Sequence, residues 1–409
     1  MAAPVTWPGH ISAALYRLGA AFTYPAFRNL WTAAFTSAAG TWMQRFAQQW
    51  LIFELTGSAF YLGLDAFVGA VPLLLFTLIG GVIADRYDRR RLLMASQVVQ
   101  MACALVLTLL VLTDSVRLGY ILALSFTTGL AQAFGGPAFQ SLIPALVPRH
   151  TLPNAVALNS IQFNLAQSIG PLIGGLVFTS LGLAACFGLN SVSFLVVIVV
   201  LALMQARPVA QDRRQSMAED LKGGLSYVGQ GGALLSLTVL AVATTSLGLP
   251  LRAFLPVFAG DPETLSRMMT TLGSGAVTGA LIVAWLGQFE RMGLTLLQVL
   301  AMFGLLVAAF ASLPIGPWSY LLLFLAGNAL LIVFSLTASL VQLSVPDDLR
   351  GRVMSIYLTA FRGGLPLGSL VSGALTRYAP TEIVVAVNAG LLTLVAVYFL
   401  VRSHGVREL

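Results

Sequence analysis

Long apolar stretches separated by short polar connections run through the whole chain. A helix needs about 20 mostly apolar residues to cross about 30 Å of hydrocarbon, and stretches of that length recur throughout. They predict six spans before a polar segment and six after it. The first six are expected at 28–54, 59–84, 92–112, 118–143, 154–180 and 183–204, and the second six at 231–257, 266–286, 294–313, 318–343, 353–378 and 382–402.

The spans divide the chain into five segments. These are an N-terminal segment (1–27), a six-helix bundle (28–204), a polar linker (205–230), a second six-helix bundle (231–402) and a tail (403–409). The N-terminal segment shows no small-residue cleavage site, so we expect a short interfacial helix there and no cleaved signal peptide.

Composition and charge support a membrane location. Of the 409 residues, 58% are hydrophobic and 9% are charged, whereas soluble domains carry about 25% charged residues. Such a chain has too few polar residues to cover its surface in water. Of the 22 lysines and arginines, 16 lie at the termini or in the even-numbered connections. Three others lie in or beside the odd-numbered connections, and three lie within spans. The positive-inside rule therefore predicts a cell-membrane protein with both termini and the linker in the cytoplasm. The net charge of +7 then reflects orientation and not nucleic-acid binding.

Sequence features of enzymes and metal proteins are absent. None of the three histidines, His10, His150 and His404, lies in a predicted span, and neither HExxH nor a P-loop occurs. Cys103 and Cys186 lie in apolar runs and are expected to be packed thiols. We therefore expect no catalytic residue, no metal and no cofactor. A channel or a membrane-embedded enzyme is the alternative from another class.

The two halves of the chain resemble each other at an offset of 198 residues. The matching pairs include Ser141-Leu142 with Ser339-Leu340, Gly81 with Gly279, Gly170 with Gly368, Gly175 with Gly373, and Asn190 with Asn388. Each partner falls in the equivalent predicted span. A parallel repeat of this kind is typical of transporters, which place the substrate between the halves near the membrane midplane. The predicted fold is all-α, with twelve transmembrane helices in two pseudo-symmetric six-helix bundles.

The connection between spans two and three, GGVIADRYDRRRLL at 80–93, combines glycines with acidic and basic residues. Its glycines allow close helix packing, and Asp85 stands at the membrane edge before a cluster of arginines. The cluster can be a positive-inside anchor. Alternatively, Asp85 lies against a helix N-terminus of the other half, where unsatisfied N–H groups favour negative charge, and acts as a latch.

This segment resembles the signature loop of the major facilitator superfamily. The residues that match it position for position are Gly81, Asp85, Arg86, Arg89, Arg90 and Arg91. The resemblance extends over the whole chain and implies that Asp85 holds the inward gate closed. Asp88 stands where the family has glycine, which puts the tight turn in question. Val283 corresponds to Asp85 in the second half, so the latch is expected on one side.

Span five contains GPLIGG, with Gly170, Pro171, Gly174 and Gly175. A proline flanked by glycines predicts a kinked, closely packed helix. The pattern also resembles the span-five motif of the exporting, antiporter branch. Together with AFRNL (26–30), TWMQR (41–45) and RGRVMS (350–355), it is similar to the branch with siderophore and macrolide exporters. Proton-coupled members usually carry an arginine in span four, where this chain has Ser125.

Charged and amide side chains within spans are candidate coupling or cavity residues, because they are costly unless they face a cavity or a partner. They are Asp65, Glu54, Arg45, Gln44, Gln48, Asn164, Arg252 and Arg362. Arg45 shares a polar stripe with both glutamines at helical spacing. The repeat offset pairs Glu54 with Arg252 and Arg362 with Asn164. Snorkelling to the outer interface is the alternative for Glu54, Asp65 and Arg252.

Together these features predict a secondary transporter that works by alternating access and exports a small amphipathic, drug-like or siderophore-like compound in exchange for protons. Uptake by a symporter of the same superfamily and lysolipid transport are the alternatives within transport. The expected partners are a small-molecule substrate, protons and the lipid bilayer. No nucleic acid is expected, and we expect a monomer.

Overall fold

The computed structural model describes residues 19–204, 232–346, 349–402 and 405–409, and the described residues form helices without strands. In the first half these are η1 (Ala20–Thr23), α2 (Pro25–Thr56), α3 (Ala59–Arg86), α4 (Arg89–Leu112), α5 (Leu118–Leu146), η2 (Arg149–Thr151), α6 (Leu152–Leu181) and α7 (Leu183–Leu203). In the second half they are α9 (Ala233–Ala243), η3 (Thr244–Gly248), α10 (Pro250–Ala259), α11 (Pro262–Leu286), α12 (Met292–Ser312), α13 (Pro317–Leu343), α14 (Arg350–Leu375) and α15 (Thr381–Arg402).

The twelve predicted spans are confirmed over the described residues, with α9, η3 and α10 together forming the seventh. The largest boundary difference is at the eighth, which was expected from 266 and begins at Pro262. Ten spans are long and apolar enough to cross a membrane by length and composition alone. The remaining two, α2 and α14, each contain three charged residues, which lower their hydropathy.

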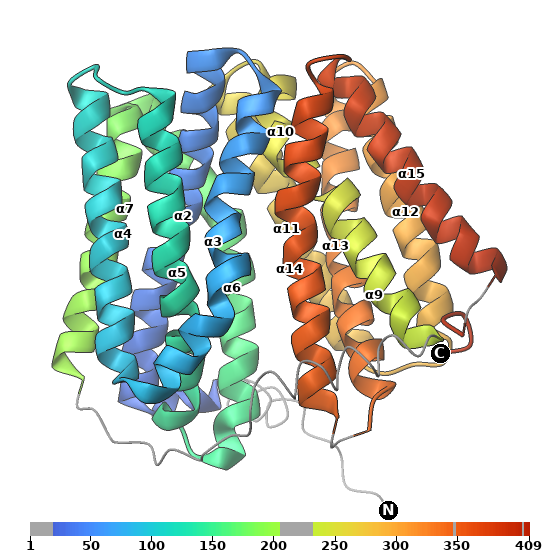
Figure 1. The fold of residues 1–409 in the computed structure, drawn as a ribbon, viewed down its shortest axis with the longest axis horizontal. Helices are drawn as coiled ribbons and strands as arrows, with labels where there is room; N and C mark the ends of the chain where they lie inside the picture. Colours follow the sequence, from blue (N-terminus) through green and yellow to red (C-terminus); the bar gives the residue numbers. More distant parts are fainter. Residues whose placement is uncertain (1–18, 205–231, 347–348, 403–404) are drawn as a thin grey trace, which may run out of the picture.

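The helices form two bundles, α2–α7 and α9–α15, that stand side by side (Figure 1). Helix α7 ends and α9 begins at the same end of the molecule, which we call the linker end. The opposite end, where α2 ends and α3 begins, is the distal end. The predicted linker 205–230 and most of the predicted N-terminal segment lie outside the described residues.

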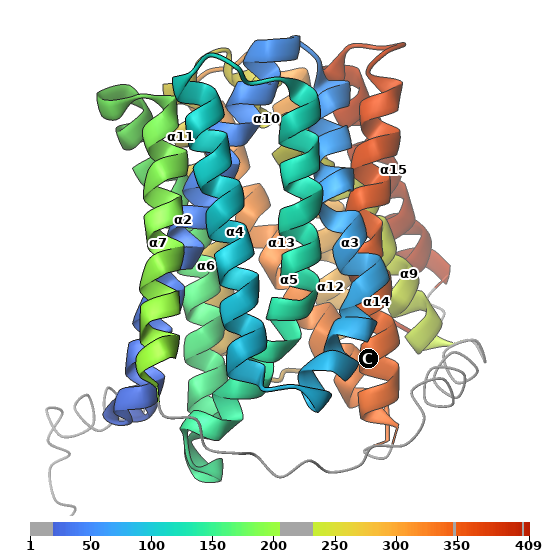
Figure 2. The same cartoon turned by 60° about the vertical axis from the view of Figure 1, so that its left-hand side comes forward.

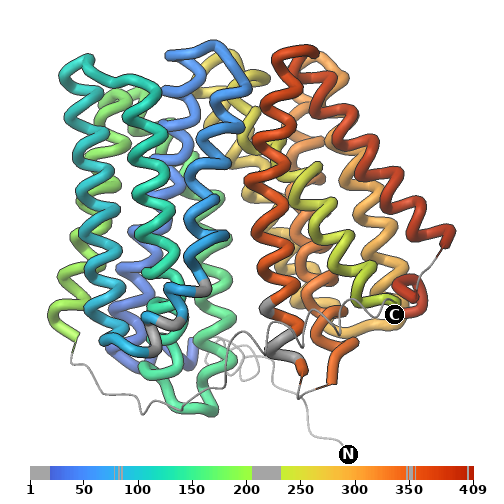
Figure 3. The backbone as a smooth tube through the Cα atoms, in the orientation of Figure 1, coloured from blue at the N-terminus to red at the C-terminus, as the bar shows by residue number. Residues whose placement is uncertain are grey.

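Contact between the bundles is concentrated in their distal halves, where α3 packs on α14 and α6 packs on α11 (Figure 2). The Ser266 hydroxyl of α11 donates a hydrogen bond to the Pro171 carbonyl of α6 at 2.9 Å. Just beyond α14, the Arg377 guanidinium carbon lies 3.6 Å from the centroid of the Phe60 ring. The ribbons of the two bundles meet at the distal end and diverge toward the linker end (Figures 1 and 3).

The seventh span is interrupted, which the sequence analysis did not predict. A π-helical turn, η3, separates α9 from α10, and Pro250 follows it. Proline cannot donate a backbone hydrogen bond, so the regular ladder cannot run through this point. Helix α14 approaches the seventh span closely at this break. Gly364 and Gly368 of α14 pack directly on Thr245 and Ser246.

The ends of spans one and seven give Arg252 a different partner from the Glu54 that the offset of 198 predicts. Spans one and seven both end at a glycine in the left-handed conformation, Gly57 with φ 59° and Gly260 with φ 73°. Aligning these ends pairs Arg252 with Gln49 and not with Glu54. The offset between these two helix ends is 203 (260 − 57) and not 198.

Candidate functional site

Asp65 of α3 is held by side chains from two other helices of its bundle. The Gln48 amide nitrogen of α2 lies 3.0 Å from each carboxylate oxygen, and the Ser125 hydroxyl of α5 donates to one of them at 2.6 Å. Gln48 also lies 2.9 Å from the Ser125 oxygen. Six residues separate Asp65 from the start of α3, which is about 9 Å along the helix axis. The carboxylate is thus inside the membrane-spanning part and connects three helices.

Ser125 stands at the position in span four where proton-coupled members of the superfamily usually carry an arginine. The position contributes a neutral hydroxyl that binds the Asp65 carboxylate directly. Sequence analysis named Ser125 only as a departure from the family pattern. Its spacing of four residues places Ser125 on the same side of α5 as Gly129, and the structure shows that Gly129 packs against the backbone of Gly69 of α3.

Arg45 of α2 stands one turn from Gln48 and is exposed in the middle of a long helix. Its guanidinium carbon lies 4.8 Å from the centroid of the Trp42 ring. Arg45 is also near enough to Asp65 and to Arg252 of the other bundle for their charges to interact. The predicted polar stripe therefore reaches the boundary between the bundles through Arg45.

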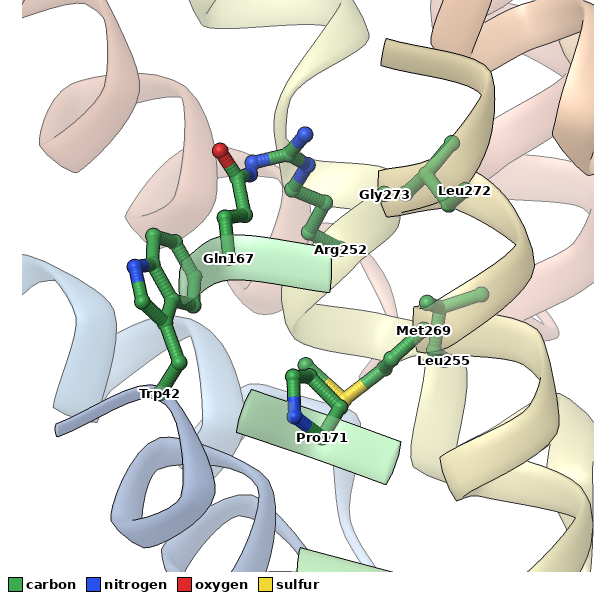
Figure 4. Close-up of a pocket in the computed structure, with 8 residues that line it drawn as sticks. All are labelled: Trp42, Gln167, Pro171, Arg252, Leu255, Met269, Leu272 and Gly273. Carbon is green, nitrogen blue, oxygen red and sulfur yellow. The ribbon is translucent and has the colours of Figure 1, made fainter. Parts of the chain in front are cut away.

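A small hollow lies where the two bundles meet. It is lined by Trp42, Gln167, Pro171, Arg252, Leu255, Met269, Leu272 and Gly273 (Figure 4). Figure 4 shows the Gln167 side chain of α6 and the Arg252 guanidinium of α10 approaching each other end to end. With its amide oxygen toward the guanidinium, Gln167 accepts hydrogen bonds from both Nη1 and Nη2, the latter at 2.7 Å. The sequence analysis did not predict Gln167 and Trp42 as site residues. Gln167 has its role through contact with Arg252 of the second half, and Trp42 through lining the hollow between the halves.

The other predicted cavity residues do not join this site. Gln44 accepts a hydrogen bond from Asn190 of α7 at 2.7 Å and so belongs to the packing of its own bundle. Asn164 donates to the Ser160 carbonyl one turn earlier. Glu54 is exposed near the distal end of α2. Arg362 is exposed on α14 and lies eleven residues, or about three turns, from Gly373, so it is on the side of α14 that faces α3.

The span-five motif packs closely on three neighbours. A Cβ at Gly170 would overlap Trp42, one at Gly174 would lie 2.7 Å from the Phe46 ring, and one at Gly175 would overlap Ser266 of the second bundle. The predicted close packing at these glycines is therefore present. Gly175 and Pro171 both contact α11, so the motif forms part of the junction between the bundles.

The turn before α4 is built by Asp88 in place of a glycine. Its backbone is extended, with φ −60° and ψ 110°, and its carboxylate accepts from the backbone N–H groups of Arg90 and Arg91 at 2.9 and 3.2 Å. Asp88 is thus the N-cap of α4, a role that aspartate fills well. The sequence analysis questioned whether the turn could form without a glycine. It forms with Asp88 because the backbone at this position is not left-handed.

Two arginines of the same loop bind carbonyl groups of their own bundle. Arg89 donates to the Ser141 carbonyl of α5 at 3.3 Å, and Arg90 donates to the Ala202 carbonyl at the end of α7 at 2.8 Å. A cation at a helix C-terminus is favoured by the helix dipole. Arg86 and Arg91 are exposed. The side chain of Asp85 lies outside the described residues, and its role as a latch stays a prediction.

Among the described residues, no group of three or more His, Cys, Asp or Glu side chains could hold a metal ion. Cys103 and Cys186 are both buried free thiols. The polar groups that converge are a carboxylate, two guanidinium groups, amides and a hydroxyl. Such an arrangement can bind and release protons and charged or polar ligands.

Comparison with known proteins places the whole described fold among transporters. Residues 19–409 match a family model described as transmembrane secretion effector. The chain is 27% identical over 382 residues to the multidrug efflux pump Tap of Mycolicibacterium fortuitum, covering 90% of this chain and 93% of that one. It is 26% identical over 365 residues to the enterobactin exporter EntS of Salmonella typhi, covering 86% of each. The crystal structure of the nucleoside transporter NupG superposes with a TM-score of 0.71 at 14% identity, covering 92% of this chain and 98% of that one.

Proposed function

Because this chain belongs to the transmembrane secretion effector family of major facilitator transporters, we propose that it is a proton-driven exporter of a small amphipathic compound. The resemblance and the fold expected from the sequence are confirmed. The names of two relatives, an efflux pump and an exporter, support the outward direction. We place the protein in the cell membrane, with both termini and the linker in the cytoplasm, as the arginine distribution predicts.

One-sided packing of α3 against the second bundle carries the proposal of alternating access. Gly63 and Gly81 lie on one face of α3, because 18 residues make five turns at about 3.6 residues per turn. Gly63 packs on the backbone of Ser369 in α14, whereas a side chain at Gly81 would meet none of the described side chains or backbone within 4 Å. Bundles that are closed at one end and unpacked at the other form one of the two states that alternating access needs. With the linker in the cytoplasm, this state faces inward.

The packing of α3 on α14 also supports a gate at the linker end. The two helices are antiparallel, and Leu74 lies 3.4 Å from the position of a Cβ on Gly363. Continuing this pairing by about three turns toward the linker end places Asp85 at the level of Arg352. In the outward-facing state, Asp85 then meets the basic N-terminal turn of α14. A carboxylate is favoured there by both the helix dipole and the arginines.

Asp65 supports protons as the driving ion. Its ionised carboxylate accepts hydrogen bonds from Gln48 and Ser125, and Arg45 lies nearby. A protonated Asp65 would present a donor in place of one acceptor, so this arrangement of α2, α3 and α5 responds to a single proton. A group of this kind connects proton binding to the relative position of helices.

Transport by the purified protein in liposomes tests the proposal. Liposomes with an acidic lumen mimic the outside of the cell for the fraction of protein whose linker faces the bath. We expect compounds from a panel of drugs, siderophores and lipids to accumulate inside, and the accumulation to stop when an ionophore collapses the pH gradient. Flux that ignores the gradient would identify a channel or facilitator. Accumulation that requires an alkaline lumen would identify an uptake symporter.

A further inference from the structure

Two guanidinium groups, one from each bundle, lie beside the same hollow. Arg252 of α10 lines it directly, and Arg45 of α2 stacks on Trp42, which lines it from the other side. The two charges are close enough to interact. They approach one another only because the bundles meet here, since α2 and α10 belong to different halves of the chain.

Neither arginine has a carboxylate partner within salt-bridge distance among the described residues. Arg252 receives only the neutral amide oxygen of Gln167, and its buried Nε atom has no hydrogen-bond partner. Asp65, the acid near Arg45, is already hydrogen-bonded to Gln48 and Ser125. The site therefore has two positive charges and one negative charge.

A buried guanidinium nitrogen without a partner, such as Nε of Arg252, is costly, and an anion that binds it recovers much of that cost. Arginine is also suited to carboxylate, sulfonate and phosphate groups, because its planar fork donates two parallel hydrogen bonds. We propose that Arg45 and Arg252 bind the acidic group of the transported compound. The proposal rests on the exporter function and narrows the substrate class to amphipathic anions.

The lining of the hollow supplies apolar surface for the body of such a compound, which the hollow can admit once the bundles move apart. Leu255, Met269 and Leu272 supply an apolar wall from the second bundle. From the first bundle, Trp42 packs edge-on against Phe163 with their ring centroids 6.1 Å apart, and Phe163 is 54% exposed. Aromatic rings beside a cationic site favour an aryl group that carries the acid.

Binding of a matched pair of fluorescent probes tests the inference. 8-Anilinonaphthalene-1-sulfonate is an aryl anion, and N-phenyl-1-naphthylamine has the same framework without the sulfonate. Their affinities are measured for the full-length protein in phosphatidylcholine nanodiscs, after subtraction of the signal from empty discs. The variants are Arg45→Gln, Arg252→Gln and Arg252→Lys. Arg267→Gln is the control, because Arg267 is an exposed arginine of α11 that pairs with Glu263.

We expect each glutamine variant to weaken binding of the sulfonate about tenfold or more and binding of the neutral probe less than twofold. A charged hydrogen bond of about 1.5–3 kcal/mol corresponds to that loss. Arg252→Lys keeps the charge and should lie between the wild type and the glutamine variant. Arg267→Gln should change neither affinity. Equal losses for both probes, or no loss for either, would overturn the inference.

Displacement from the wild-type protein tests the inference without relying on a variant. Naphthalene-2-sulfonate should displace the anionic probe at a concentration about tenfold below that of naphthalene-2-sulfonamide, and equal displacement would contradict the site. Discs that contain phosphatidylglycerol show whether the bound anion is a lipid headgroup or a soluble compound. If this lipid displaces the anionic probe, the site binds a lipid headgroup. If it does not, the site binds a soluble compound. These readouts measure binding alone, so a failure of proton-driven transport would refute the proposed function and leave the anion site standing.

Discussion

Gly63 of α3 packs directly against the backbone carbonyl of Ser369 in α14, and no side chain fits between the two helices. This contact belongs to the distal junction of the bundles. A Cβ on Gly81, five turns further along the same face of α3, would have none of the described residues within 4 Å. Among the described residues, the same helix face is therefore tightly packed at one end and unpacked at the other, as the proposed alternating access requires of one of its two states.

Substitution of these glycines should shift the protein in opposite directions. Gly63→Ala overpacks the distal junction at a cost of about 1–3 kcal/mol, which favours distal opening by about fivefold or more. Gly81→Ala is accommodated in the described state and hinders closure at the linker end, so it favours the inward-facing state. Spin-label distances across the distal ends of α3 and α14 measure both shifts.

Gly119→Ala is the matched control for this pair. Gly119 lies at the distal start of α5, and a side chain there would meet nothing within 4 Å, so its substitution should leave the distance distribution unchanged. A shift of the Gly63 and Gly81 variants in the same direction would contradict the assignment of the two ends to two states.

Asp85→Asn should weaken the outward-facing state, in which the linker end is closed. The attraction between a carboxylate and a facing helix N-terminus is worth about 0.3–2 kcal/mol. Removal of that charge shifts a balanced equilibrium several-fold toward the inward-facing state. Distances between spin labels at the linker ends of α3 and α14 should lengthen on average. An unchanged distribution in a folded variant would reduce Asp85 to an anchor for topology.

Asp88→Ala should lower stability without affecting transport direction. The carboxylate caps α4 through the backbone N–H groups of Arg90 and Arg91, and loss of such a cap costs about 0.5–2 kcal/mol. The melting temperature in detergent measures the loss. Asp88→Asn retains a capping oxygen and should melt close to the wild type. Equal melting temperatures for the wild type and Asp88→Ala would show that the cap contributes nothing.

The sequence predicted the spans well because long, mostly apolar stretches mark them, including α2 and α14 with their three charged residues each. It predicted the site less well, and the polar stripe of α2 shows why. Gln44 and Gln48 have the same residue type and lie one turn apart, yet Gln44 binds Asn190 of α7 and Gln48 binds Asp65 of α3. Helical spacing places both on one side of α2 but does not identify the neighbouring helix that each one meets.

Contacts between the halves were the hardest to predict. The pairing of Gln167 with Arg252 depends on the break in the seventh span and on how the two bundles meet. A repeat with a fixed offset pairs Arg252 with Glu54, whereas the ends of spans one and seven pair it with Gln49. Such contacts require the tertiary arrangement, as do those of Arg89 with α5 and of Arg90 with α7.

The central claim is that protons drive transport through Asp65. The Asp65→Asn variant distinguishes proton coupling from the movement of substrate across the membrane. Asparagine keeps one oxygen that accepts from Ser125 and Gln48, so the packing of α2, α3 and α5 should survive. A neutral amide does not titrate, so a proton gradient can no longer act at this position. Glu54→Gln is the matched control, because Glu54 is an exposed acid near the distal end of α2.

The decisive measurement compares proton-driven accumulation with substrate exchange across liposomes that have no pH gradient. For Asp65→Asn, we predict that driven accumulation falls to the level of protein-free liposomes while exchange continues, and that Glu54→Gln retains both activities. If Asp65→Asn supports both modes at wild-type rates, Asp65 is not the coupling residue and the account is contradicted.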